Sequence, residues 1–249
     1  MDICPSFLHA PNCGATRSHF EPSYAMIDYE NGTLNAYRTT ARAAEYKRYH
    51  TKGWTWGRLV TCIEQRAIAR ELGRYQWSAS DQLLDIPCGT GIMGRILHRF
   101  PFKIVASDIS PEMMAMARAE YPPDRLLACV QADITNTPFP RGSFACVVAL
   151  GFLHRVPIPI KRAALREIAA LSNRLVIVSC SVDTPLQRLK HVLLRRLKRG
   201  HIAAPCPMPF KDILSECLSH GLRLNRAFMV IPMLSSHAVF ILEKVDLHD

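Results

Sequence analysis

The sequence predicts an α/β protein with a doubly wound, seven-stranded sheet that is mostly parallel, has an antiparallel final strand and carries helices on both faces. Short apolar segments alternate with helical segments of about ten residues, as in βαβ units. A glycine-rich turn joins the first of these strands to a helix. The last two apolar runs lie close enough in sequence to form an antiparallel hairpin at the sheet edge.

The N-terminal part is expected to lie outside this sheet. Residues 1–36 are rich in Pro, Gly, Asn and Ser without a sustained period, which predicts a loosely ordered arm. Residues 37–78 are expected to form a cap of two helices, because apolar side chains recur there at helical spacing. Residues 79–249 then form the α/β domain, with a helical lid insertion at about 184–210.

The α/β domain divides into elements by its apolar pattern. Strands are expected at 82–86, 103–107, 127–131, 144–150 and 174–180, and helices at 91–99, 111–120, 160–171 and 210–220. The strands are apolar almost throughout, as is typical of parallel strands covered on both faces. The hairpin takes up 222–232 and 235–245.

Composition narrows the class of protein. The chain has 249 residues, 49% hydrophobic and 21% charged, which is ordinary for a globular domain. Its nine cysteines form no CxxC pair, so we expect reduced thiols, no metal site and a cytoplasmic location. No stretch reaches the ~18 apolar residues of a membrane span. The net charge of +10 favours contact with phosphates, nucleic acid or anionic lipid.

The segment LLDIPCGTGIMG, residues 83–94, is the first indication of a binding site. Its glycines lie where a strand meets a helix, so a ligand can pack against the backbone and meet free N–H groups. Asp108 ends the second strand roughly twenty residues later, where a carboxylate can bind ribose hydroxyls. Asp133 follows the third strand, in a position to reach an adenine edge. The structural alternatives are a tight turn for the glycines and helix N-caps for the two aspartates.

These segments resemble the class I S-adenosylmethionine-dependent methyltransferases, within them the type 11 group that includes the ubiquinone/menaquinone methyltransferases. LLDIPCGTG is similar to the first motif of the family, SDISPEMMAMAR to its ribose-binding motif, and ADITNTPFPRGSFACVVAL to its adenine loop and fourth strand. The resemblance covers about residues 80–182 and implies a Rossmann-like fold with S-adenosylmethionine as cofactor. A nicotinamide-binding Rossmann enzyme is the competing interpretation.

The resemblance implies a set of cofactor-binding residues. The methionine half would be held by Asp85, Pro87, Cys88, Gly89, Thr90 and Gly91. The adenosine half would be held by Asp108 at the ribose, Ile109 and Met113 around the ring, Asp133 and Ile134 at adenine, and Leu150 after the fourth strand. Core packing is the alternative role for Met113.

His154 is the candidate general base, because a proton acceptor assists methyl transfer to a hydroxyl or an acidic carbon. A structural histidine is the alternative. A bacterial subgroup of the family found beside lipopolysaccharide and cell-envelope sugar genes often reads RFLHH where this chain reads GFLHR, so Gly151 and Arg155 depart from that pattern. Candidate substrate residues are Tyr46, Arg58 and Phe152, while the tryptophans of the cap could close over the ligands or anchor the cap to the domain.

The expected function is methyl transfer to a small molecule, with O-methylation of a sugar-, lipid- or natural-product-like acceptor as the expected reaction. Six Lys and Arg between residues 188 and 199 share the lid helix with a leucine face, so the lid could contact an anionic substrate or a membrane surface. A solvated lid is the alternative. The other functions considered are C- or N-methylation of a quinone or heteroaromatic ring, and an RNA-modifying or RNA-binding protein. No RNA-binding module is visible, so nucleic acid is not the expected partner, and the oligomeric state stays open.

Overall fold

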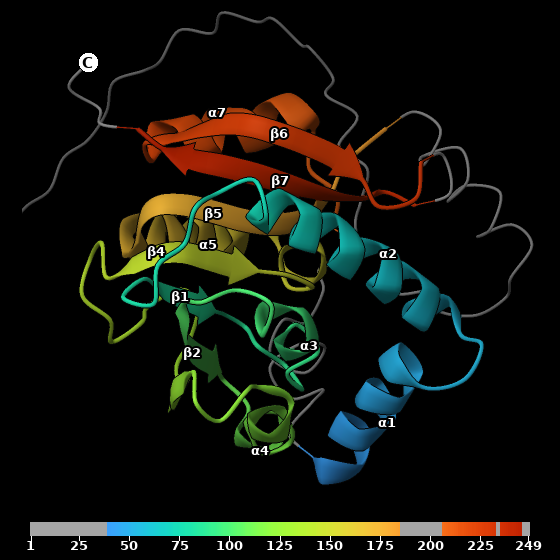
Figure 1. Cartoon of the computed structure of the whole chain (residues 1–249). Helices are drawn as coiled ribbons and strands as arrows, with labels where there is room; N and C mark the ends of the chain where they lie inside the picture. The colour runs from blue at the N-terminus through green and yellow to red at the C-terminus, as the bar shows by residue number, and fades with distance from the viewer. Residues whose placement is uncertain (1–38, 185–205, 233–234, 246–249) are drawn as a thin grey trace, which may run out of the picture.

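The computed structural model describes residues 39–184, 206–232 and 235–245, and these ranges form one seven-stranded sheet of order β3-β2-β1-β4-β5-β7-β6 (Figure 1). The strands are β1 Gln82–Asp85, β2 Lys103–Asp108, β3 Leu126–Gln131, β4 Phe144–Ala149, β5 Ser172–Ser181, β6 Leu222–Met229 and β7 His237–Lys244. Strands β1 to β5 pair in parallel, and β7 runs antiparallel to both β5 and β6. The predicted fold class is therefore confirmed. The predicted arm and nearly all of the lid lie outside the described residues.

Helices cover both faces of the sheet (Figure 1). They are α1 Thr40–Thr51, α2 Trp56–Leu72, α3 Gly94–Leu97, α4 Pro111–Ala117, α5 Ile158–Leu171 and α7 Phe210–Ser219, with single 3₁₀ turns η2 Arg118–Glu120 and η3 Leu153–Arg155. Side chains of α5 and α7 share one apolar core, and those of α2, α3 and α4 share the other. Neighbouring strand residues alternate between the two cores, as Leu83 and Leu84 do in β1, because successive side chains point to opposite faces. No helix in the described ranges has the length and apolar character needed to cross a membrane.

The two predicted cap helices are present and begin at threonine N-caps. The side chain of each threonine, Thr39 and Thr55, accepts a hydrogen bond from the backbone N–H of the residue three positions later. This satisfies one N–H group that has no partner within the helix. Helix α1 is held to the end of α4, because Lys47 Nζ lies 2.8 Å from Glu120 Oε1 and 3.2 Å from the Met116 carbonyl oxygen. The first cap helix therefore packs against the helix that follows β2.

Two sequence predictions are wrong in detail. The helix expected at 91–99 is reduced to α3, since the chain makes consecutive turns through residues 90–93 and Gly91, at φ 76°, cannot continue a right-handed helix. Strand β3 is not covered on both faces: it lies at the sheet edge, its residues are half-buried or exposed, and Leu127 is 53% exposed. An apolar sequence alone does not separate an edge strand from a central one.

Candidate functional site

Two adjoining cavities lie at the carboxyl ends of the parallel strands, where ligands bind in open α/β sheets. The first, of about 100 Å³, is bounded by the residues that follow β1, β2, β3 and β4. The second, of about 370 Å³, extends from the turn after β1 to the cap helices and to the start of β7. The residues common to both walls are Tyr46, Pro87, Gly89, Leu150, Gly151 and Arg155. The cavities therefore meet beside the glycine turn.

The three glycines of this turn differ in what an added side chain would meet. A Cβ atom at Gly89, where φ is 54°, would meet nothing within 4 Å, so this residue leaves open space at the point where the cavities meet. A Cβ atom at Gly91 would lie 2.7 Å from the Ala117 carbonyl oxygen, and one at Gly94 would lie 2.5 Å from the Glu120 carbonyl oxygen. Close packing against the α4–η2 backbone therefore explains Gly91 and Gly94, whereas at Gly89 the left-handed φ is the only constraint that the structure shows.

Asp108, the residue predicted to bind a ribose, ends β2 and lines the first cavity. One carboxylate oxygen accepts a hydrogen bond from Gly89 N at 2.8 Å, and the other accepts one from Ser110 N at 2.9 Å. Burial raises the pKa of Asp108, an effect that its backbone hydrogen bonds oppose. The N-cap of α4 is Ser110, which accepts from Met113 N, so the N-cap alternative for Asp108 is wrong.

The other residues predicted to hold adenosine also lie together at the first cavity. Ile109, Met113, Asp133 and Ile134 all line it. Asp133 Oδ1 accepts hydrogen bonds from the backbone and the hydroxyl of Thr135, each at 2.8 Å, and no helix begins there, so its N-cap alternative is wrong. Met113 is only 5% exposed, which means that it packs in the protein and lines the cavity at once.

Asp85 is the buried acid of the glycine turn. Its side chain lines the second cavity, and its Oδ2 accepts a hydrogen bond from the Tyr121 hydroxyl at 2.6 Å. Burial raises the pKa of Asp85 to about 7, and the nearby charge of Asp108 adds to this effect, while the Tyr121 hydrogen bond opposes it. Sequence reasoning missed Tyr121, because it follows α4 in a turn segment with no motif of its own.

Asp85→Asn should make stability less dependent on pH. The pKa of Asp85 rises from 3.8 to about 7, so the folded chain holds a proton that the unfolded chain releases between these values. The free energy of unfolding supplied by this group therefore falls as pH rises from about 4 to about 7. We expect the stability difference between variant and wild type to grow across this window, up to on the order of 4 kcal/mol. Urea unfolding at about pH 4 and about pH 8 measures it, and an unchanged difference contradicts the assignment.

The remaining motif residues face the second cavity. Pro87, Cys88, Gly89 and Thr90 line it, whereas Gly91 lines neither cavity. Thr90 is fully buried, and its hydroxyl has no hydrogen-bond partner among the described residues. A buried hydroxyl without a partner is costly, so this atom suits a polar ligand atom.

The predicted substrate residues do not all come together. Tyr46 lines both cavities and Phe152 lines the first, but Arg58 lines neither. The exposed Arg58 side chain donates to the Gly53 carbonyl oxygen at 2.9 Å. Trp56 lines the second cavity, and Trp54 is fully exposed, so it does not anchor the cap to the described part of the domain.

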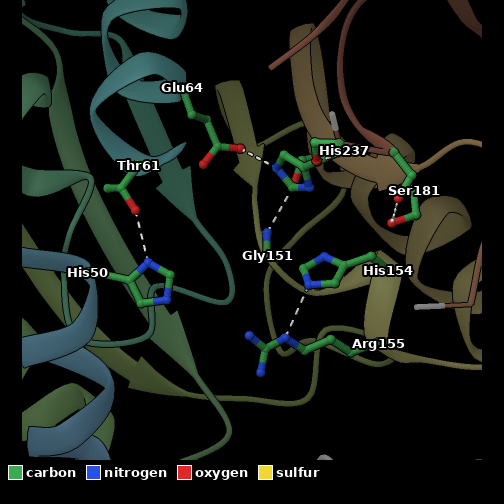
Figure 2. A network of polar contacts seen from close by, with 11 residues as sticks. His50, Thr61, Glu64, Gly151, His154, Arg155, Ser181 and His237 are labelled. Carbon is green, nitrogen blue, oxygen red and sulfur yellow. Dashed lines mark hydrogen bonds and ion pairs between the residues drawn. The ribbon is translucent and has the colours of Figure 1, made fainter. Parts of the chain in front are cut away.

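Three histidines from distant segments line the second cavity: His50 of α1, the predicted His154 of η3, and His237 of β7 (Figure 2). The rings of His154 and His237 are perpendicular, with centroids 5.5 Å apart. His154 Nε2 accepts from Arg155 Nε at 3.2 Å, while its buried Nδ1 has no hydrogen-bond partner among the described residues. Burial, and then the Arg155 charge, hold the pKa of His154 well below its ordinary value.

Comparison with known proteins identifies the domain that carries these cavities. The family model described as "Methyltransferase domain" matches residues 83–174. The chain is also 32% identical over 108 residues to a demethylmenaquinone methyltransferase of Clavibacter sepedonicus. Residues 83–174 therefore form a methyltransferase domain, of the class I S-adenosylmethionine-dependent, type 11-like kind. The alignment covers 43% of this chain and 43% of that relative, and so spans less than half of the relative's length.

Solved structures share the fold of this chain. Magnesium protoporphyrin IX methyltransferase from Synechocystis PCC 6803 with bound SAH has a TM-score of 0.69 at 16% identity, over 88% of this chain and 98% of that one. Geranyl diphosphate C-methyltransferase from Streptomyces coelicolor A3(2) has a TM-score of 0.53 at 14% identity, over 72% of this chain and 76% of that one. At these identities the likeness shows the fold alone.

The first cavity and the glycine turn fit the cofactor of this family. S-adenosylmethionine combines an adenosine with a charged methionine half, and the open space at Gly89 lies between the two cavities. Asp108, with its buried carboxylate, lines the first cavity. Thr90, whose hydroxyl has no partner among the described residues, lines the second. The chemistry of these groups therefore agrees with S-adenosylmethionine as cofactor.

Proposed function

We propose that the chain transfers a methyl group from S-adenosylmethionine to a small-molecule acceptor, by O-methylation of a sugar-, lipid- or natural-product-like hydroxyl. The observation that carries this proposal is the second cavity, which adjoins the cofactor residues at Gly89 and is lined by histidines that can exchange a proton with a hydroxyl. S-adenosylmethionine supplies an activated methyl group, so the main task of the chain is to position the acceptor.

The predicted residues that line the two cavities would then have defined tasks. Asp108 would hold the ribose hydroxyls, and Asp133 with Ile134 would hold adenine, beside Ile109, Met113 and Leu150. Asp85 and the turn from Pro87 to Thr90 would hold the methionine half. Tyr46 and Phe152 are proposed to contact the acceptor, and His154 stays a candidate general base. Arg58 has no task in this arrangement, because it lines neither cavity.

C-methylation of a quinone ring is the second candidate function. It is favoured by the similarity to a demethylmenaquinone methyltransferase, and a neutral histidine can also accept a proton from an acidic carbon. Contact of the basic residues 188–199 with an anionic acceptor or a membrane stays a prediction, because these residues lie outside the described ranges. The RNA alternative, which rests on the net charge of the chain, also stays a prediction. A cytoplasmic location is supported by the described cysteines, all of which are free thiols.

Calorimetric titration with S-adenosylmethionine, followed by a methyl-transfer screen, tests the proposed function. We expect S-adenosylmethionine to bind and NADH not to bind, since the family is that of the methyltransferases. The screen should contain hydroxylated metabolites, quinols and primary amines, with transfer to a hydroxyl expected. Binding of NADH in place of S-adenosylmethionine contradicts the cofactor assignment. A salt-dependent gel shift with RNA, without transfer to any small molecule, supports the RNA alternative.

A further inference from the structure

A carboxylate–imidazole pair in the second cavity has no counterpart among the residues predicted from the sequence. Glu64 Oε1 lies 2.7 Å from His237 Nε2, although the residues are 173 positions apart in the chain (Figure 2). Both residues line the cavity, and their side chains are only 14% and 15% exposed. Helix α2 supplies the carboxylate and the first residue of β7 supplies the imidazole, so the pair joins the cap to the sheet.

The contact fixes the tautomer of the imidazole. An ionised carboxylate can only accept a hydrogen bond, so Nε2 of His237 carries the hydrogen and Nδ1 carries the lone pair. A carboxylate in this position also stabilises the imidazolium ion that forms when Nδ1 takes a proton. Partial burial strengthens this interaction, because water screens it less than at the surface.

The other two histidines of the cavity are less suited to accept a proton. Nε2 of His154 already accepts a hydrogen bond from Arg155, and burial holds the pKa of His154 far below its ordinary value. Nδ1 of His50 is bonded to Thr61 Oγ1 at 2.9 Å, and burial followed by the Arg155 charge lowers the pKa of His50. His237 is the histidine of this cavity that has a carboxylate hydrogen-bonded to its ring.

We propose that His237 is the general base for methyl transfer and that Glu64 is its positioning residue. This inference rests on the proposed function. The acceptor oxygen forms a bond to the methyl carbon, the carbon–sulfur bond breaks with its electron pair staying on sulfur, and the hydroxyl proton passes to Nδ1 of His237. The proton then leaves to water, which restores the neutral imidazole. Because imidazole is a weak base, the acceptor that suits it best among the hydroxyls of the proposed function is an acidic one, of the phenol or enol type found in natural products.

The test compares His237→Gln and Glu64→Gln with a matched pair outside both cavities. His220 Nε2 and Glu216 Oε1 of α7 lie 3.2 Å apart and line neither cavity, so His220→Gln and Glu216→Gln are the controls. The probes are S-adenosylmethionine with a panel of phenols and catechols. We expect kcat to fall about 10²–10⁴-fold in His237→Gln and by a smaller factor in Glu64→Gln, with cofactor affinity retained. The controls should keep wild-type turnover.

Imidazole ¹⁵N spectra of the full chain with S-adenosylmethionine show which ring nitrogen of His237 carries the hydrogen, and they need no acceptor. Wild-type His237 should be protonated at Nε2, and Glu64→Gln should lose this preference. Protonation at Nδ1 overturns the proposal, as does His237→Gln with wild-type turnover or loss of turnover in His154→Gln alone. Cofactor binding without methylation of any phenol or catechol overturns the acceptor class. If S-adenosylmethionine does not bind, the proposed function fails. The spectra still show, independently of that result, whether Glu64 fixes the tautomer of His237.

Discussion

Gly91→Ala is expected to lower the free energy of unfolding by roughly 2–6 kcal/mol. The left-handed conformation at φ 76° costs a non-glycine residue about 1–3 kcal/mol. The new Cβ atom would also lie 2.7 Å from the carbonyl oxygen and 2.8 Å from the Cα atom of Ala117, and forced overpacking costs about 1–3 kcal/mol more. Urea unfolding of the purified variant measures the loss.

Gly89→Ala is the matched control for this prediction. Gly89 has the same left-handed conformation, but the added Cβ atom would meet no atom within 4 Å. We expect a loss limited to the conformational cost of about 1–3 kcal/mol, with the chain still folded. Because that Cβ atom would project into the space where the cavities meet, affinity for S-adenosylmethionine should fall in this variant. Equal stability losses at the two glycines would contradict the packing argument for Gly91.

Asp108→Asn should weaken S-adenosylmethionine binding roughly 10–150-fold. A hydrogen bond to a charged group contributes about 1.5–3 kcal/mol, and each 1.4 kcal/mol is tenfold in affinity. The amide oxygen can accept from only one of Gly89 N and Ser110 N, so the affinity is compared on a variant whose folding has been verified by circular dichroism. Calorimetric titration of the folded variant measures the change.

Asp124→Asn provides the control for the ribose carboxylate. The side chain of Asp124 is 75% exposed, and its ion pair with Arg125 at 3.7 Å is of the surface kind that contributes little. This variant should bind S-adenosylmethionine as the wild type does. Wild-type affinity in Asp108→Asn would remove Asp108 from the cofactor site.

The strands and the first cavity could be predicted because their signals are local. Each central strand is a short apolar run, and Asp108 and Asp133 follow such runs directly. The helix at 91–99 was mispredicted because a glycine that starts a helix and a glycine that prolongs a turn look alike in sequence. Its packing against Ala117 became visible only in three dimensions.

The second cavity was harder to predict because its walls come from distant parts of the chain. His237 lies in an apolar run with no motif, and Glu64 lies among the charged positions of an amphipathic helix. Only the docking of α2 beside β7 brings the two side chains to 2.7 Å. Arg58 is a candidate substrate residue by its place in the predicted cap, but its side chain is exposed and donates to the Gly53 carbonyl oxygen, in the segment before α2.

The placement of β7 between β5 and β6 determines when the second cavity can be completed during synthesis. In the described sheet β6 pairs with β7 alone, so β6 cannot join the sheet until the later strand has emerged from the ribosome. The same late strand carries His237. A nascent chain that has finished the nucleotide-binding half therefore still lacks the imidazole of the second cavity, and assembly of this cavity is coupled to the last step of sheet formation.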